Sequence, residues 1–356
     1  MKIDIAPNGG SDALADVAAL ARRAELAGAD GVAYPERSSD AMLHVTLAAT
    51  GTTRAELITN VVVAFARSPM TLATQAWAVQ QLAGGRLTLG LGAQVRAHIQ
   101  RRFSMPWSAP RARMRDFVGA LHAIWTTWAT GVPLAYEGEF YQHTLMSPMF
   151  TPVGSAPPPK VKLAALGPGM AELAAEIADG VLIHPFTTET YLREQVRGAL
   201  DRGAAGRDPA ERARFEVTGS PFAVVGRTEA ELAAGIEELR SRLAFYGSTP
   251  AYRRVLETHG WGDLGDRLHT LSRSTAPGRW AEMARLLPEE MLREFAVIGP
   301  PEEAAAALVD RYRGLLDRCQ LNVTGLPSLQ ERLDFVALLQ NTVAQQYERP
   351  SAGSAV

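Results

Sequence analysis

The segment LAALGPGMAELAAEIADG, residues 163–180, places glycine, proline and glycine between a strand-like run and a helix-like run. Gly167 and Gly169 would let the backbone approach a ligand closely, and the free N–H groups that begin the helix would face it. Such a corner binds phosphate without a cationic side chain. No GK[ST] follows, and Glu172 occupies the third small position of a dinucleotide fingerprint. The residues alone favour either a phosphate site or a tight turn that needs glycine to admit the helix.

Few side chains at the other strand ends could transfer a proton. Glu36, with Asp40 close behind it, follows the run GVAYPE. His98 and His184 each follow another strand-like run, where a histidine can donate a proton or a hydrogen bond to a cofactor, or be a loop residue without a chemical role. Gln94 follows a GLG turn, so it could hydrogen-bond a cofactor ring or simply start a helix.

Several classes of chemistry are disfavoured by what the sequence lacks. Schiff-base enzymes need a lysine in the site, but Lys2, Lys160 and Lys162 all lie at strand beginnings. The seven histidines show neither HxH nor HExxH spacing, so we predict no metal site. A retaining glycosidase needs two carboxylates facing each other from strand ends, and only Glu36, with Asp40 close behind it, is well placed. The sequence therefore predicts that a bound cofactor carries the reaction.

The elements that would position these residues form a regular repeat. Eight strand-like runs alternate with helical patterns: 2–7, 31–36, 57–65, 86–93, 160–166, 180–186, 215–225 and 318–326. Most are apolar throughout, which indicates a parallel sheet buried on both faces. Their spacing predicts an α/β fold, a (β/α)8 TIM barrel with insertions after strands four and seven; an open doubly wound sheet is the alternative. In a barrel, the loops that carry the site converge at the C-terminal ends of the strands.

Length and composition set the remaining expectations. The chain of 356 residues is expected to form one domain over 1–347, with insertions at about 104–160 and 227–317 and a disordered tail at 348–356. Its 36 basic and 38 acidic residues predict a small-molecule substrate, with no nucleic acid and no membrane as partner. The N-terminus lacks a signal-peptide pattern, and the single cysteine, Cys319, is expected to fill the core. Both favour a cytoplasmic location.

Three stretches carry a resemblance to a known family. Residues 58–107, ITNVVVAF to SMPW, resemble the luciferase-like flavin and deazaflavin oxidoreductases. Residues 167–188, GPGMAELAAEIADGVLIHPFTT, are similar to the branch that uses coenzyme F-420, an 8-hydroxy-5-deazaflavin, and FAVIGPPEEAAAAL at 295–308 resembles a segment before the last strand. The resemblance implies a homodimer through the second and third helices. It also implies a non-proline cis peptide at Asn60–Val61, behind the cofactor ring.

The resemblance also implies roles for individual residues. Contacts to the cofactor are expected from Asn60, Val61, Gln94, His184 and, around its phosphate, Leu166, Gly167, Pro168, Gly169 and Met170. Glu36 and His98 are the expected proton-handling groups. Arg96, Phe103 and Trp107 are expected on the substrate side, because the insertion after strand four would cover the mouth of the barrel, the opening at the C-terminal ends of its strands. Relatives often carry a histidine after strand two, where this chain has Ser38 and Ser39. Proton transfer here must then use another group or water.

These observations favour a deazaflavin-dependent oxidoreductase. Hydride would pass between carbon 5 of coenzyme F-420 and a C=C, C=N or alcohol/carbonyl group of a small organic substrate. One alternative is a monooxygenase that uses reduced FMN. Another is a barrel that binds a cofactor or ligand without catalysis. The identity of the bound cofactor separates the first two.

Overall fold

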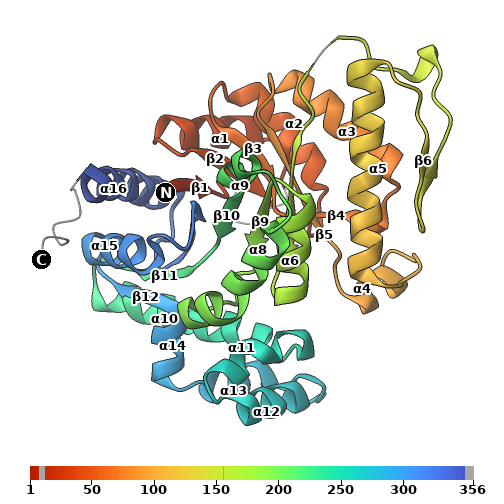
Figure 1. The fold of residues 1–356 in the computed structure, drawn as a ribbon. Helices are drawn as coiled ribbons and strands as arrows, with labels where there is room; N and C mark the ends of the chain where they lie inside the picture. Colours follow the sequence, from red (N-terminus) through yellow and green to blue (C-terminus); the bar gives the residue numbers. More distant parts are fainter. Residues whose placement is uncertain (8–12, 155, 349–356) are drawn as a thin grey trace, which may run out of the picture.

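The computed structural model describes residues 1–7, 13–154 and 156–348, and its centre is a closed barrel of parallel strands (Figure 1). The barrel strands are β1 (Lys2–Ile5), β2 (Gly31–Tyr34), β3 (Glu56–Thr59) with its continuation β4 (Val62–Val63), β5 (Leu87–Gly92), β8 (Lys160–Ala165), β9 (Gly180–Ile183), β10 (Glu216–Gly219) and β13 (Arg318–Gln320). Each pairs in parallel with its neighbours, and the β3–β5 and β1–β13 pairings close the ring. The predicted TIM barrel is confirmed, and the open sheet is excluded.

Helices surround this barrel and bury its outer face. They include α1 (Val17–Leu26), α2 (Ala41–Gly51), α3 (Pro69–Leu82), α5 (Pro110–Thr130), α6 (Pro168–Ile177), α8 (Arg197–Ala204), α15 (Pro301–Tyr312) and α16 (Leu329–Glu348). Polar caps fix the starts of two of them: the Asp40 carboxylate accepts from the Met42 N–H, and the Ser68 hydroxyl accepts from the Thr71 N–H. The disordered tail was predicted to span 348–356; residue 348 instead ends α16, and residues 349–356 lie outside the described residues.

Two predicted strands, 215–225 and 318–326, are each divided in the structure. The first divides into β10 and β11 (Phe222–Val225) around Ser220 and Pro221, because proline has no N–H for a ladder. The second divides into β13 and β14 (Asn322–Thr324). Both second halves leave the barrel and form a separate sheet, in which β11 pairs with β14 on one side and with β12 (Ala296–Gly299) on the other. Strand β12 was not predicted from the sequence. An unbroken apolar run therefore predicted a buried strand correctly, but it did not show that the two halves of the run belong to different sheets.

Two long segments interrupt the repeat. Between β5 and β8 lie α4 (Arg96–Arg101), α5 and a hairpin of β6 (Tyr136–Glu137) and β7 (Gln142–His143). Between β10 and β13 lie β11, α10 (Glu229–Gly247), the 3-10 turn η4 (Pro250–Tyr252), α11 (Arg253–Thr258), α12 (Gly262–Ser272), α13 (Arg279–Arg285), α14 (Glu289–Phe295), β12 and α15. In Figure 1 the group α10 to α14 projects from one end of the barrel. No described helix is long and apolar enough to span a membrane.

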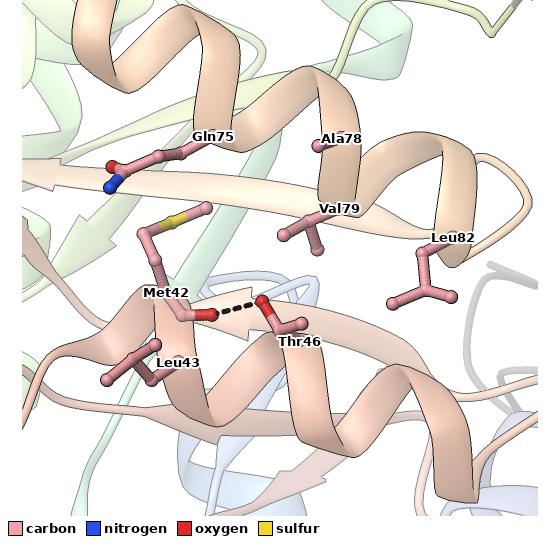
Figure 2. A pocket seen from close by; sticks show the side chains of 7 residues that line it. All are labelled: Met42, Leu43, Thr46, Gln75, Ala78, Val79 and Leu82. Atoms are coloured by element: carbon pink, nitrogen blue, oxygen red, sulfur yellow. Dashed lines mark hydrogen bonds between the residues drawn. The ribbon is translucent and has the colours of Figure 1, made fainter.

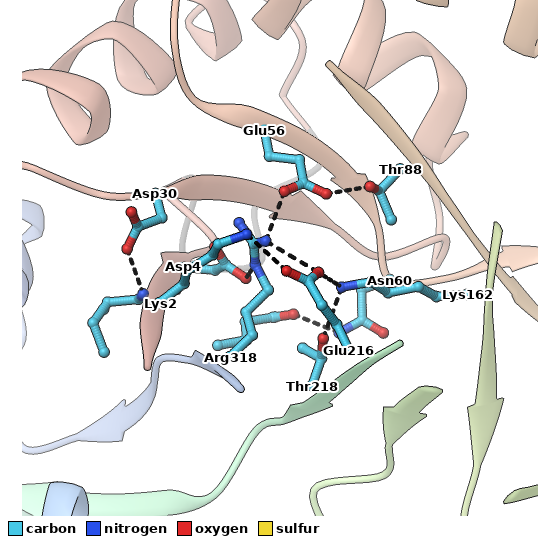
Figure 3. A network of polar contacts seen from close by, with 12 residues as sticks. Lys2, Asp4, Asp30, Glu56, Asn60, Thr88, Lys162, Glu216, Thr218 and Arg318 are labelled. Atoms are coloured by element: carbon cyan, nitrogen blue, oxygen red, sulfur yellow. Dashed lines mark hydrogen bonds and ion pairs between the residues drawn. The ribbon is translucent and has the colours of Figure 1, made fainter. Parts of the chain in front are cut away.

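Charged side chains from the first three residues of several barrel strands form a buried network at the end opposite the C-terminal mouth (Figure 3). Arg318 Nε donates to Asp4 Oδ2 at 2.5 Å, and its Nη1 donates to Glu56 at 2.6 Å. Lys162 Nζ donates to Glu216 at 2.7 Å. Burial outweighs the attraction of Arg318 and raises the pKa of Asp4 to about 6. We call these charges the barrel floor. Lys2 and Lys162 were predicted to lie at strand beginnings, but the network that they form with the carboxylates was not predicted.

Candidate active site

The third barrel strand is interrupted by a bulge at its C-terminal end. The bond between Asn60 and Val61 is cis, at the position that the family resemblance implied. Glycines of β5 make room for the bulge: a Cβ on Gly90 would lie 1.9 Å from the Thr59 carbonyl oxygen, and one on Gly92 would lie 2.6 Å from Val61 Cγ2. The GLG pattern of β5 is therefore required by the neighbouring strand.

Glu36 holds this bulge in place. Its carboxylate accepts a hydrogen bond from the Val63 N–H and another from Arg67 Nη1, each at 2.9 Å. Arg67 also donates from Nη2 to Asp40 at 2.8 Å. Although burial alone would lower the pKa of Arg67, the carboxylates of Glu36 and Asp40 raise it. Glu36 is thus one partner of an ion pair that links the ends of β2 and β3. No sequence pattern identified Arg67 as the other partner.

The loop that follows β5 contains all the non-glycine residues with positive φ in the described chain. These are Gln94 at 59°, Ser104 at 54° and Ala109 at 25°. Non-glycine residues in this region are uncommon, and they occur more often at ligand-binding and active sites than elsewhere. Their concentration in residues 94–109 indicates a loop whose shape is fixed by more than its local sequence preference.

Arg113 fixes the far end of this loop beside the bulge. This buried side chain donates to the Pro106 carbonyl at 2.7 Å and to the Tyr141 hydroxyl at 2.8 Å. Its guanidinium lies 4.4 Å from the ring centre of Phe65, and Trp107 contacts the same ring edge to face at 6.0 Å. Trp107, predicted on the substrate side, therefore lies next to the chain that leaves the bulge.

Four other predicted residues, at positions 94, 96, 98 and 103, occupy the more exposed part of the same loop. Gln94 accepts from the neighbouring Val95 N–H at 3.0 Å, and Arg96 donates to Gln100 at 2.9 Å along α4. His98 is exposed on α4, and Phe103 is half-buried under the Arg102 guanidinium. None of these four side chains forms a hydrogen bond with the Glu36–Arg67 ion pair in the described chain, and we call this exposed part of the loop the rim.

The glycine-proline corner lies at the C-terminal end of β8, the strand that follows β5 around the barrel. Gly167 is the N-cap of α6 and faces open space, since a Cβ there would meet nothing within 4 Å. The first-turn N–H groups of the helix lack intrahelical partners. Arg111 of α5 lies against the corner, because a Cβ on Gly169 would be 3.4 Å from its Nη1. Leu166, Pro168 and Met170 are half-buried around it.

His184 directly follows β9, the next strand. Its Nδ1 accepts from the Phe186 N–H at 3.0 Å, so the hydrogen of a neutral ring is on Nε2, which lies 3.2 Å from the Tyr252 hydroxyl. Tyr246 packs edge to face on the ring at 5.1 Å. Burial lowers the pKa of His184 to about 4, so the imidazole is neutral at physiological pH. His184 positions Tyr252 of the second long segment through this Nε2–H. Because the ring is neutral, it is not a general acid at this pH.

The matching family model settles the relationship of this chain to known proteins. The model for luciferase-like monooxygenases matches residues 1–318. The chain belongs to the luciferase-like monooxygenase family. This family identity confirms the resemblance predicted from residues 58–107 and 167–188.

Three similar proteins show how far the relationship extends within the luciferase-like family. Uncharacterized protein Rv1360 of Mycobacterium tuberculosis is 49% identical over 306 residues, which cover 84% of this chain and 89% of that protein. A putative coenzyme F420-dependent oxidoreductase of the same organism, Rv3520c, is 30% identical over 79% of this chain and 83% of its own length. The solved structure of an F420-dependent secondary alcohol dehydrogenase superposes with a TM-score of 0.71 at 15% identity, covering 96% of this chain and 98% of that chain, which shows a shared fold.

In this luciferase-like barrel, the predicted site residues occupy consecutive strand ends. Glu36 follows β2, Asn60 and Val61 follow β3, the loop of residues 94–109 follows β5, the corner follows β8 and His184 follows β9. They therefore form one continuous arc of the mouth. Sequence reasoning missed the arginines at positions 67, 111 and 113 and Tyr252, because each comes from a helix or insertion whose position depends on the folded barrel.

Proposed function

We propose that this chain is a coenzyme F-420-dependent oxidoreductase that transfers hydride between carbon 5 of the deazaflavin and a small organic substrate. The substrate group would be a C=C or C=N bond, or an alcohol/carbonyl pair. The observation that carries this proposal is the open glycine-proline corner, with Arg111 beside it, in the same arc of the mouth as the Asn60–Val61 bulge. The similarity to Rv3520c, named as a putative F420-dependent enzyme, supports the choice of cofactor.

The residues of this arc fit a phosphate-bearing ring cofactor. The first-turn N–H groups of α6 and the Arg111 guanidinium supply donors and positive charge to a phosphate, and Gly167 leaves the backbone accessible. The bulge at Asn60 and Val61 offers a rigid backbone surface for a planar ring system. When bound, the deazaflavin supplies a ring carbon that gives or accepts hydride. Trp107 and Phe103, on the loop over this surface, would exclude water.

Proton handling is assigned differently from the prediction made for Glu36. Its carboxylate is engaged by Arg67 and by the Val63 N–H, which supports the bulge, so we assign Glu36 a positioning role. His98 remains our proposed site of proton exchange with solvent, because it is exposed on α4 at the rim. Tyr252 is a further candidate donor: its oxygen accepts from His184 Nε2, which leaves the phenolic hydrogen free for a ligand oxygen or nitrogen.

The test is a titration of the purified protein with coenzyme F-420 and with FMN, followed by absorbance and fluorescence. We expect saturable binding of the deazaflavin and weak or no binding of FMN. Preference for FMN would instead support the monooxygenase alternative, which the name of the family model favours. Binding of F-420 without turnover on alcohols, enones and imines would support a non-catalytic barrel, and binding of neither would overturn the assignment of the corner.

We also propose that the enzyme is a homodimer through α2 and α3. These two helices contain no aspartate, glutamate, lysine or arginine, although 21% of the chain is charged. Their outer faces form an apolar groove of about 300 Å³ (Figure 2), lined by Met42, Leu43, Thr46, Gln75, Ala78, Val79 and Leu82. Leu43 and Leu82 are about half exposed. An uncharged helical face of this kind is typical of an interface between subunits.

A further inference from the structure

A second uncharged surface lies in the segment between β7 and β8. Residues 144–154, which we call the arm, expose four large apolar side chains: Leu145 at 82%, Met149 at 86%, Phe150 at 70% and Val153 at 94%. No charged residue occurs from Thr144 to Pro159. Scattered exposed apolar residues are common, but four within nine positions of an uncharged segment indicate a surface that a partner covers.

The arm is held to the body at both ends, so its exposed side chains have a defined place. Trp128 of α5 contacts Met146 through Nε1 and Sδ at 3.5 Å. Gln81, in the last turn of α3, donates to the Val153 carbonyl at 2.8 Å. Pro148 and Pro152 restrict the backbone between these contacts, which lowers the entropy that would be lost on binding a partner.

The arm and the groove between α2 and α3 are neighbouring surfaces. Gln81 contacts the arm, and the next residue, Leu82, lines the groove. The groove also contains an unsatisfied acceptor: Gln75 Oε1 is buried and has no donor among the described residues. Figure 2 shows the Gln75 side chain extending from α3 above Met42. The exposed side chains of the groove, such as Leu43 and Leu82, lack apolar contacts that a docked segment can supply.

We propose that the arm of each copy packs on the α2–α3 face of a second copy, with Met149 and Phe150 entering its groove. This inference rests on the homodimer proposed above and adds the segment that completes its interface. Two observations favour a second copy over another partner. Arm and groove are both uncharged, so each suits the other, and they lie side by side on one protomer. A two-fold axis beside Leu82 places each arm over the partner's groove, and the two contacts are equivalent.

The first experiment measures molar mass by light scattering across a dilution series. The test variant is Met149→Glu/Phe150→Glu, and the matched control is Leu26→Glu, which alters an apolar residue of α1 that is 73% exposed. We expect a dimer for the wild-type protein and for the control, and at least a tenfold weaker dimer for the arm variant. An arm variant that dimerises like the wild type overturns the proposal, as does a monomeric wild-type protein.

A cross-link distinguishes the arm contact from dimerisation by other surfaces. Protein with Phe150→Cys is mixed with protein with Thr46→Cys, and the mixture is oxidised and run on a non-reducing gel. The natural Cys319 is buried and does not compete. We expect a linked dimer in the mixture and much less in the Thr46→Cys sample alone. A stable dimer without this cross-link would retain the homodimer and refute the arm. F-420 titration of the arm variant separates either result from the proposed function, since the arm contributes none of the proposed cofactor contacts.

Discussion

Replacing Arg318 by methionine tests whether the barrel floor is a balanced set of charges. Arg318 is 1% exposed in its side chain and is the cation that contacts Asp4, whose other oxygen, Oδ1, has no hydrogen-bond partner in the described chain. Three cations, Lys2, Lys162 and Arg318, face the carboxylates at positions 4, 56 and 216. Without the arginine, two cations face three carboxylates. Leaving a buried charge without its partner costs about 3–5 kcal/mol, which is the expected loss in the free energy of unfolding at pH 8.

The loss should depend on pH in a specified direction. The pKa of Asp4 is already raised from 3.8 to about 6 in the folded protein, and removal of Arg318 raises it further. A protonated Asp4 gives the folded variant one more bound proton than its unfolded state, so its stability increases as pH falls. Wild-type Asp4 is ionised in both states above about pH 7. The difference between the two proteins should therefore shrink by about 1.4 kcal/mol per pH unit between pH 8 and pH 7.

Urea unfolding followed by circular dichroism at pH 7 and pH 8 measures both quantities. Arg193→Met is the matched control, because Arg193 pairs with Glu189 one turn away on an exposed surface, where such pairs contribute about 0.3–0.5 kcal/mol. If Arg318→Met does not fold, the double variant with Asp4→Asn should recover much of the stability, because both partners are then neutral. A loss below about 1 kcal/mol, or one that is equal at both pH values, would refute the balanced-floor explanation.

Three further predictions concern the mouth. Arg111→Ala should weaken F-420 binding about tenfold and make the affinity less dependent on salt than in the wild type. Arg115→Ala, one turn later on α5, should leave the affinity unchanged. Fluorescence titration at two salt concentrations measures both effects. Arg67→Met should weaken F-420 binding by at least tenfold, because Glu36 loses the cation that holds it at the bulge; unchanged affinity would remove that role. Between about pH 6.5 and about pH 4, neutral His184 should lower wild-type stability as the pH falls, because it must bind a proton on unfolding, whereas the raised pKa of Asp4 acts in the opposite sense in wild type and variant alike. The urea midpoint of His184→Gln should therefore rise relative to that of the wild type over this range, and a constant difference between the two midpoints would contradict the prediction.

Regular repetition made the barrel predictable, but the ends of individual strands were not. Eight apolar runs at near-even spacing were enough to place the barrel strands. The division at Ser220 and Pro221 and the extra strand β12 depend on pairing between segments far apart in sequence. The charged floor was also missed, because a single Asp4 or Lys162 does not disturb an otherwise apolar run. A charge within such a run becomes interpretable only when the opposing strand supplies its partner.

The site was predictable where backbone geometry dictates residue type. Gly90 and Gly92 of β5 are glycines because the bulge of the neighbouring strand comes close to them, and Gly169 in the corner lies against Arg111. Gly167 faces open space, where the absence of a side chain leaves the backbone accessible. By contrast, the role of Glu36 changed once Arg67 was seen beside it, 31 positions away in the sequence. No local pattern records such a pair, since a carboxylate after a strand looks the same whether it is free or held by a cation.

The distribution of polar groups along the barrel axis agrees with a reaction that is performed by a bound cofactor and not by the side chains themselves. The floor concentrates buried charge, whereas at the mouth Glu36 is occupied by Arg67, and His184 is held neutral by burial and a backbone N–H. Fixed, neutral or paired groups are poor general acids, but they provide a site whose shape and charge stay constant through a reaction. Hydride transfer to or from a bound ring needs mainly that constancy, together with exclusion of water. In the proposed reaction, the exposed His98 and the phenol of Tyr252, which lie on an inserted loop and an inserted segment, would be where substrate-specific proton transfer varies while the barrel is unchanged.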